Sequence, residues 1–148
     1  MVDIEQLRRD WVGVEFHRAD FAIEQEPVLA YAASCGDEDP RYADPSHPDF
    51  AAHPMYVGCL GNTREAMMPK EFPDLGPGRS IDGGKSVEVL APIRVGDVLS
   101  GRAQIADIYA KTGRSGTMLF IVHRMNFYNQ RDEHVATVDL RQIKAVGS

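Results

Sequence analysis

The residues of this sequence that could do acid–base chemistry gather between positions 36 and 53. Asp37 follows Gly36 in the segment GDEDPRYAD, Tyr42 lies five positions later, and His53 precedes a long apolar run. A carboxylate paired with a group that titrates near neutrality can hold and polarise one water molecule and move a proton. Histidine is such a group, whereas tyrosine as a residue type titrates near pH 10 and is a poor base at pH 7. We therefore take Asp37, Tyr42 and His53 as candidate catalytic residues.

The same residues also have structural interpretations. The acidic run from Asp37 to Asp44 could cap and solvate a loop. His53 could be a side chain at a helix start, held by a backbone hydrogen bond, and a histidine in that position has this role more often than a catalytic one. His123 lies in an apolar strand pattern and is more typical of a satisfied interior or interface histidine than of a ligand.

Helix signals place the acidic segment directly after a helix. Pro27 near the start and Gly36 just past the end predict a helix over 25–35. A short helix over 4–11 and a strand over 14–21 precede it. Residues 40–54 are rich in Pro, Asp, His and Ser and predict a long irregular segment, which in a compact domain is more often functional than not.

The run MYVGCLGNTREAMM, residues 55–68, predicts one long buried helix with Pro54 as its first residue. Gly58 and Gly61 are unfavourable in a helix interior, so they indicate close approach of surrounding backbone. Cys35 and Cys59 fall in predicted helices without metal-ligand spacing, and we expect reduced, packed thiols with neither a disulfide nor a bound metal.

A Pro/Gly-rich connector spans residues 69–78. Four β-like runs follow it, at residues 80–90, 97–110, 116–130 and 134–146. The strand over 116–130 is apolar on both faces. One helix can cover only one of them, so we expect a second chain to cover the other. The pattern predicts an α+β fold in which a curled antiparallel sheet wraps around one long central helix.

Length and charge narrow the possible partners. The 148 residues fit one domain, 1–148, and the formal net charge of -6 disfavours a nucleic-acid partner. The start MVDIEQLRRD lacks a signal-peptide core, and no stretch approaches the roughly 20 apolar residues that span a bilayer. We therefore expect a cytoplasmic protein without membrane contact.

Four blocks, in order, carry a resemblance: GDEDPRYAD, AAHPMYVG, IDGGKSVEVLAPIRVGD and MLFIVHRMNFYNQRDEHVATV. From about Leu7 to its end the sequence resembles the MaoC-like hot-dog dehydratases. It is most similar to the branch that forms the N-terminal, FAS1-like hot-dog of two-domain hydratases and the non-catalytic small subunits of heteromeric (3R)-hydroxyacyl-thioester dehydratases. The resemblance implies the hot-dog fold, no cofactor, and acyl thioesters of coenzyme A or acyl carrier protein as substrates.

The resemblance also assigns roles, with two departures. Asp37 matches the family's catalytic aspartate, but Tyr42 takes the place of its histidine. Pro54 takes the place of a glycine whose N–H receives the thioester oxygen, and proline has no N–H. Met55 or Tyr56 could still supply an amide there.

Four glycine-rich or acidic positions complete the expected substrate-binding set. Gly58 lies in the expected central helix. Asp82, Gly83 and Gly84 either let a pantetheine arm pass close to backbone or form a β-bulge.

Three functions remain open. The chain could be a subunit of an enoyl-thioester hydratase or dehydratase whose catalytic pair lies on another hot-dog chain, which we favour because of Tyr42. It could be a self-sufficient homodimeric hydratase or thioesterase that uses Asp37 with His53 or Tyr42. It could also bind acyl thioesters without turnover.

Overall fold

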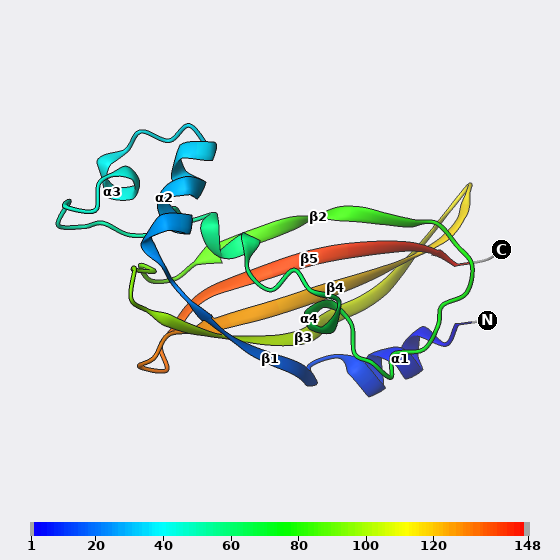
Figure 1. Cartoon of the computed structure of the whole chain (residues 1–148). Helices are drawn as coiled ribbons and strands as arrows, with labels where there is room; N and C mark the ends of the chain where they lie inside the picture. Colours follow the sequence, from blue (N-terminus) through cyan, green and yellow to red (C-terminus); the bar gives the residue numbers. More distant parts are fainter. Residues whose placement is uncertain (1, 147–148) are drawn as a thin grey trace.

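Five antiparallel strands form one curled sheet in the computed structural model, which describes residues 2–146 (Figure 1). The strands are β1 Glu15–Ala22, β2 Ser80–Val89, β3 Val98–Gly113, β4 Gly116–Tyr128 and β5 His134–Val146, in the order β1-β3-β4-β5-β2. Every strand predicted from the sequence is present, with small differences at the ends. The predicted domain 1–148 includes residues 1, 147 and 148, which lie outside the described residues.

Four short helices and one 3₁₀ turn accompany the sheet. They are α1 Ile4–Trp11, α2 Gln25–Ser34, α3 Pro40–Ala43, the 3₁₀ turn η1 Tyr56–Cys59, and α4 Arg64–Met67. The predicted helices at 4–11 and 25–35 are confirmed. The segment predicted to be irregular contains α3, a single turn whose N-cap side chain, Asp39, accepts from the amide of Arg41. Figure 1 shows α2 and α3 together beyond one end of the sheet.

The prediction of one long helix over 55–68 is wrong. Only η1 and α4 form there, and they contact β1, β2 and β5 of the sheet. Gly61 separates them with a φ of +72°, a left-handed conformation that no α-helix continues through. A Cβ at Gly61 would lie 2.6 Å from Met125 Sδ, so the predicted close approach is present, but to a side chain of β4. Thr63 then caps α4 by accepting from the amide of Ala66.

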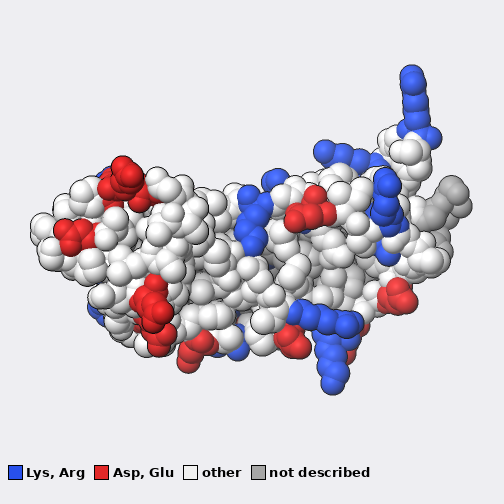
Figure 2. Space-filling model, turned by 45° about the horizontal axis from the view of Figure 1, so that its top comes forward, with Lys and Arg blue, Asp and Glu red and all other residues white. Residues whose placement is uncertain are grey.

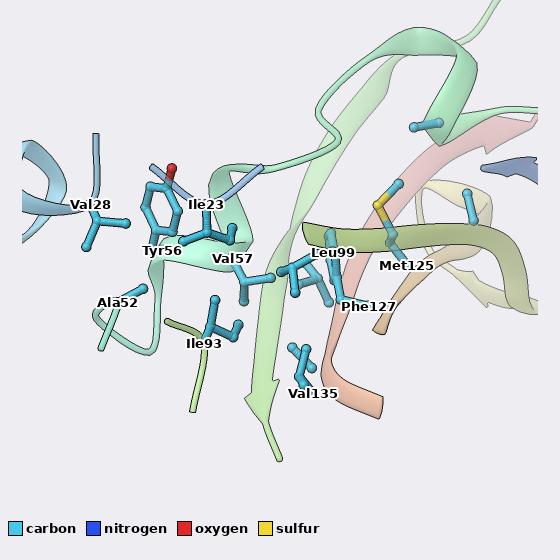
Figure 3. Packing of buried hydrophobic residues seen from close by; sticks show 14 residues of the cluster. Ile23, Val28, Ala52, Tyr56, Val57, Ile93, Leu99, Met125, Phe127 and Val135 are labelled. Carbon is cyan, nitrogen blue, oxygen red and sulfur yellow. The ribbon is translucent and has the colours of Figure 1, made fainter. Parts of the chain in front are cut away.

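Two apolar clusters fill the inner face of the sheet. The first, shown in Figure 3, lies at the end next to α2 and η1 and includes Ile23, Val28, Val57, Leu99, Phe127 and Val135. The second lies toward α1 and contains Leu7, Ile105, Ile108, Leu119 and Ile121. His123 of β4 stands on the same face of the strand, between Ile121 and Met125, where the two clusters meet.

The two apolar faces predicted for β4 differ in their cover. Leu119, Ile121 and Phe127 on the inner face are completely buried. Met118 and Phe120 on the outer face are half-buried, and the Phe120 ring stacks on Tyr109 at a centroid distance of 4.8 Å. Burial of this outer face by a second chain stays a prediction.

The cysteine prediction is wrong in one respect, because Cys35 and Cys59 are both exposed. Cys35 is the C-cap of α2 and Cys59 ends η1, so neither occupies the interior of a packed helix.

Charge is unevenly placed over the surface. Acidic side chains predominate over the α2–α3 end in the view of Figure 2, while Lys and Arg lie along the sheet toward its other end. Among the described residues, no helix is long and apolar enough to cross a membrane.

Candidate active site

Asp37 and His53 meet beside α2. Asp37 lies in the loop that follows this helix, and its amide donates to the carbonyl of Ala32. Its Oδ2 lies 3.1 Å from His53 Nε2, and the two side chains are 32% and 17% exposed. The other carboxylate oxygen accepts from the amide of Asp39 at 3.0 Å. The structure thus joins two of the three candidate catalytic residues in one contact.

Both ring nitrogens of His53 are engaged. Nδ1 accepts from the amide of Met55 at 3.1 Å, so in the neutral ring the hydrogen is on Nε2, the nitrogen that lies 3.1 Å from Asp37 Oδ2. The contact proposed for a catalytic pair and the backbone bond of a structural histidine are therefore both present. In this arrangement the ring offers no free lone pair to a substrate.

Two tyrosine rings pack against the histidine ring, and a third packs against one of them. The Tyr42 ring lies 5.2 Å from the His53 ring, centroid to centroid, and Tyr31 lies 5.8 Å from it. Tyr31 also packs against Tyr56 in an edge-to-face contact at 5.7 Å. Burial raises the pKa of both Tyr31 and Tyr56, so each keeps its proton at neutral pH and cannot act as a base.

The acidic loop is held by its own ion pair. The Arg41 guanidinium donates to both carboxylate oxygens of Asp39, with a shortest distance of 2.7 Å. This side-chain hydrogen bond lowers the pKa of Asp39 to about 2, so the carboxylate is ionised at neutral pH. Asp39 serves as the cap of α3 and not as a proton donor.

The amides that could receive a thioester oxygen are already bonded. Pro54 has no N–H. The Met55 amide donates to His53 Nδ1, and the Tyr56 amide donates to the His53 carbonyl at 2.8 Å. Neither amide named from the sequence is free to stabilise an oxyanion in this conformation.

A cleft of about 610 Å³ opens beside these residues. Tyr42, His53, Pro54 and Met55 line one wall. A second, largely apolar part of the wall comes from the end of β2 and the connector to β3, Val87 and residues 89–94. Pockets of this size take small organic ligands. No motif marks this second part of the wall as a binding site in the sequence, although it is formed by the block VEVLAPIR, which carries part of the family resemblance.

The remaining predicted binding residues lie elsewhere. Asp82, Gly83 and Gly84 form a β-bulge, because the register of β2 against β5 shifts there and Asp82 Oδ1 accepts from the Gly84 amide at 2.8 Å. Gly58 is part of η1, and a Cβ there would lie 3.1 Å from Val87 Cγ2, closer than ordinary van der Waals contact, so glycine lets the turn pack closely on β2. None of these residues lines the cleft.

His123 lies outside the cleft, and only one of its two ring nitrogens has a hydrogen-bond partner among the described residues. Its Nε2 lies 3.2 Å from Gln142 Oε1, while Nδ1 is buried and has no partner within the part of the chain that the structure describes. Burial lowers the pKa of His123. The interior location predicted for this histidine is therefore confirmed.

One protein family matches most of the chain. The model of the family described as "FAS1-like, dehydratase domain region" matches residues 10–138. The chain belongs to this family. No curated protein matches the sequence.

Solved structures place this FAS1-like dehydratase domain in the hot-dog fold of the MaoC-like dehydratases. The MaoC-like dehydratase from Phytophthora capsici is 21% identical with a TM-score of 0.69, over 99% of this chain and 50% of that one. A chain of the ChsH1-ChsH2 complex from Mycobacterium tuberculosis is 20% identical with a TM-score of 0.69, over 98% and 90%. The HadBC (3R-hydroxyacyl-ACP dehydratase) complex from the same organism gives 17% and 0.67, over 90% and 97%.

Proposed function

We propose that this chain serves the interconversion of 2-enoyl and (3R)-3-hydroxyacyl thioesters as a substrate-binding or stabilising subunit, with the acid–base pair on a partner hot-dog chain. The observation that carries the proposal is the bonding of the turn at His53. Both ring nitrogens and the amides of Met55 and Tyr56 are engaged within the chain. The cleft therefore has walls for an acyl group, but the turn at His53 supplies neither a free imidazole as base nor a free amide as oxyanion donor.

The reaction needs both of these groups. Hydration adds water across the double bond, so a base must take a proton from water while a donor delivers one to the α-carbon. Negative charge develops on the thioester oxygen and is stabilised by N–H groups aimed at it. Tyr42 stands where the family has its histidine, and Pro54 stands where the family has its donor.

The position of the cleft supports a partner chain. Val87 and Val89 of β2 line the cleft, and β2 is an edge strand of the sheet. A second chain that paired with this edge would bring its own residues to the mouth of the cleft. Two similar structures, ChsH1-ChsH2 and HadBC, are complexes, which favours a heteromer over a homodimer.

A second candidate function has one specific observation in its favour. The 3.1 Å contact between Asp37 and His53 would suit a self-sufficient homodimeric hydratase or thioesterase, provided that His53 exchanged its bond to Met55 for a proton from water. Acyl-thioester binding without turnover is the third alternative, and it shares the cleft with the first.

The test compares the chain alone with the chain co-expressed with a hot-dog relative that has an intact Gly-Asp-x-Asn-Pro-x-His motif. Hydration of crotonyl-CoA and of a longer 2-enoyl-CoA is followed by loss of the enoyl absorbance. We expect the mixed complex to exceed both the isolated chain and the isolated relative. Turnover by the chain alone above about 10 s⁻¹, the median of ordinary enzymes, would overturn the subunit proposal and favour Asp37 with His53. Activity that His53→Gln abolishes would identify that pair as the source.

A further inference from the structure

The charged side chains of the cleft differ in what neutralises them. Arg41, Asp49 and Arg94 line it. The Arg41 guanidinium is committed to Asp39 through three hydrogen bonds, the shortest at 2.7 Å. The hydrogen bond to Asp39 raises the pKa of Arg41, and the negative charge of Asp49 raises it further. This side of the cleft has no uncompensated cation.

Arg94 is the exception. It forms no ion pair with any carboxylate of residues 2–146. Its one side-chain bond runs from Nη1 to the carbonyl of Phe50 at 3.2 Å. A guanidinium has five N–H donors, so most of the donors of this exposed residue, which lines the cleft, have no partner among residues 2–146.

The backbone holds Arg94 firmly in place. The Arg94 amide donates to Asp97 Oδ2 at 2.9 Å, and the Asp97 amide donates to the Arg94 carbonyl at 3.0 Å. Asp97 is itself buried and accepts from Gln130 Nε2 at 2.9 Å. The preceding residue, Ile93, is buried and its carbonyl accepts from the Ala52 amide at 2.7 Å. These bonds fix the backbone from which the Arg94 side chain extends, and the Phe50 contact lowers the side-chain entropy that is lost on binding an anion.

We propose that Arg94 binds the phosphate of the phosphopantetheine arm that carries the acyl group. The inference rests on the proposed function, because it needs an acyl thioester in the cleft. A planar guanidinium matches a pair of non-bridging phosphate oxygens. The apolar wall formed by β2 suits the acyl group, and Arg94 follows directly on the connector that continues that wall. Coenzyme A and acyl carrier protein share this phosphate, so the site serves either carrier.

The experiment uses three saturated thioesters, which bind without turnover: butyryl-CoA, S-butyryl-4′-phosphopantetheine and S-butyryl-pantetheine. Affinities are measured by isothermal titration calorimetry on the full chain, on Arg94→Ala, and on Arg114→Ala. Arg114 lies in the turn between β3 and β4, at the opposite end of the sheet, and is the matched control. Circular dichroism and thermal unfolding check that each variant folds.

We expect Arg94→Ala to weaken the two phosphate-bearing ligands by about 10- to 100-fold, the range of a charge-assisted hydrogen bond. Binding of S-butyryl-pantetheine and all binding by Arg114→Ala should be unchanged. Equal losses for butyryl-CoA and for the phosphopantetheine thioester locate the contact at the shared phosphate.

Two other outcomes would overturn the inference while leaving the proposed function intact. In the first, Arg94→Ala weakens all three ligands equally or weakens none. In the second, only butyryl-CoA loses affinity, which would move the contact to the nucleotide part of coenzyme A. If the wild-type chain binds no thioester at all, the substrate-binding role in the proposed function is wrong, and the inference about Arg94 is wrong with it.

Discussion

Restoring the two missing groups should create hydratase activity in the isolated chain. Tyr42→His places an imidazole on the cleft wall next to His53, whose partner is Asp37. Pro54→Gly adds an N–H at the only residue of that turn whose amide is absent, since the amides of Met55 and Tyr56 are engaged. Together the changes supply a base and an oxyanion donor.

The magnitudes follow from these two groups. An oxyanion donor contributes about 10²- to 10³-fold and a general base about 10²- to 10⁴-fold in rate. Groups that act as a unit do not contribute independently, so we expect the double variant to exceed the parent by at least about 10²-fold and the single Tyr42→His by less. Pro54→Gly should cost about 1 kcal/mol of stability through the greater freedom of the unfolded chain.

The assay is hydration of crotonyl-CoA, with Tyr42→Phe combined with Pro54→Gly as the matched control that restores the N–H but not the base. The control should remain close to the parent. A double variant that folds yet stays inert, while an authentic hydratase works in the same cuvette, would refute the placement of the site. Asp37 would then be a loop-capping residue that binds His53 for structural reasons.

Three further predictions concern stability and assembly. Because burial lowers the folded-state pKa of His123 below 6.5, the unfolded chain binds the proton first as pH falls. Stability should therefore be complete above about pH 6.5 and decrease below it, and the melting temperature of His123→Gln should fall less between about pH 7.5 and 5.5. Gly101→Ala should cost about 1–3 kcal/mol in urea unfolding, because its Cβ would meet Met125 Sδ at 2.8 Å and Phe127 Cε1 at 3.1 Å. Gly113→Ala, on the same strand with no atom within 4 Å, is the control and should cost little. Light scattering on the purified chain should show a dimer or a larger species, because a second chain is expected to bury the outer face of β4. A stable monomer that never joins a hot-dog relative would contradict both this burial and the subunit role.

The strands could be predicted from the sequence because each has a local signal. In β3, apolar residues such as Leu99, Ala103 and Ile105 alternate with polar ones and are buried in the structure. In β4 an apolar run bounded by turn residues predicts a strand, and the strand is present. Alternation and turn chemistry act within a few residues, so they can be recognised without knowledge of the fold.

The break between η1 and α4 could not be predicted in the same way. The run 55–68 has the apolar composition of a buried helix, but the space on the inner face is partly filled by Met125, a residue 64 positions after Gly61. Gly61 adopts its left-handed conformation at the point where that distant side chain packs against it. Local propensity favoured a helix, and tertiary packing overrode it.

The site was only half predictable for a similar reason. Asp37, Tyr42 and His53 could be named by residue type and by resemblance, but the contact of Asp37 with His53 depends on the path of the loop between them. That path is fixed by α3 and by the bond from the Ala52 amide to the Ile93 carbonyl, across the fold. Spacing along the chain carries no information about such a bond.

The division of the inner face into two clusters bears on how the molecule opens. The cleft rests on the cluster that includes Val57 and Leu99, while α1 rests on the cluster that includes Leu7 and Ile108. At the boundary, His123 has a buried ring nitrogen with no hydrogen-bond partner within residues 2–146, and an unpaired buried polar atom lowers stability locally. Amide hydrogens of α1 should therefore exchange through a local opening that leaves protection at the cleft end unchanged. Sequence changes in the far cluster can then alter the overall lifetime of the fold while the cleft keeps its shape.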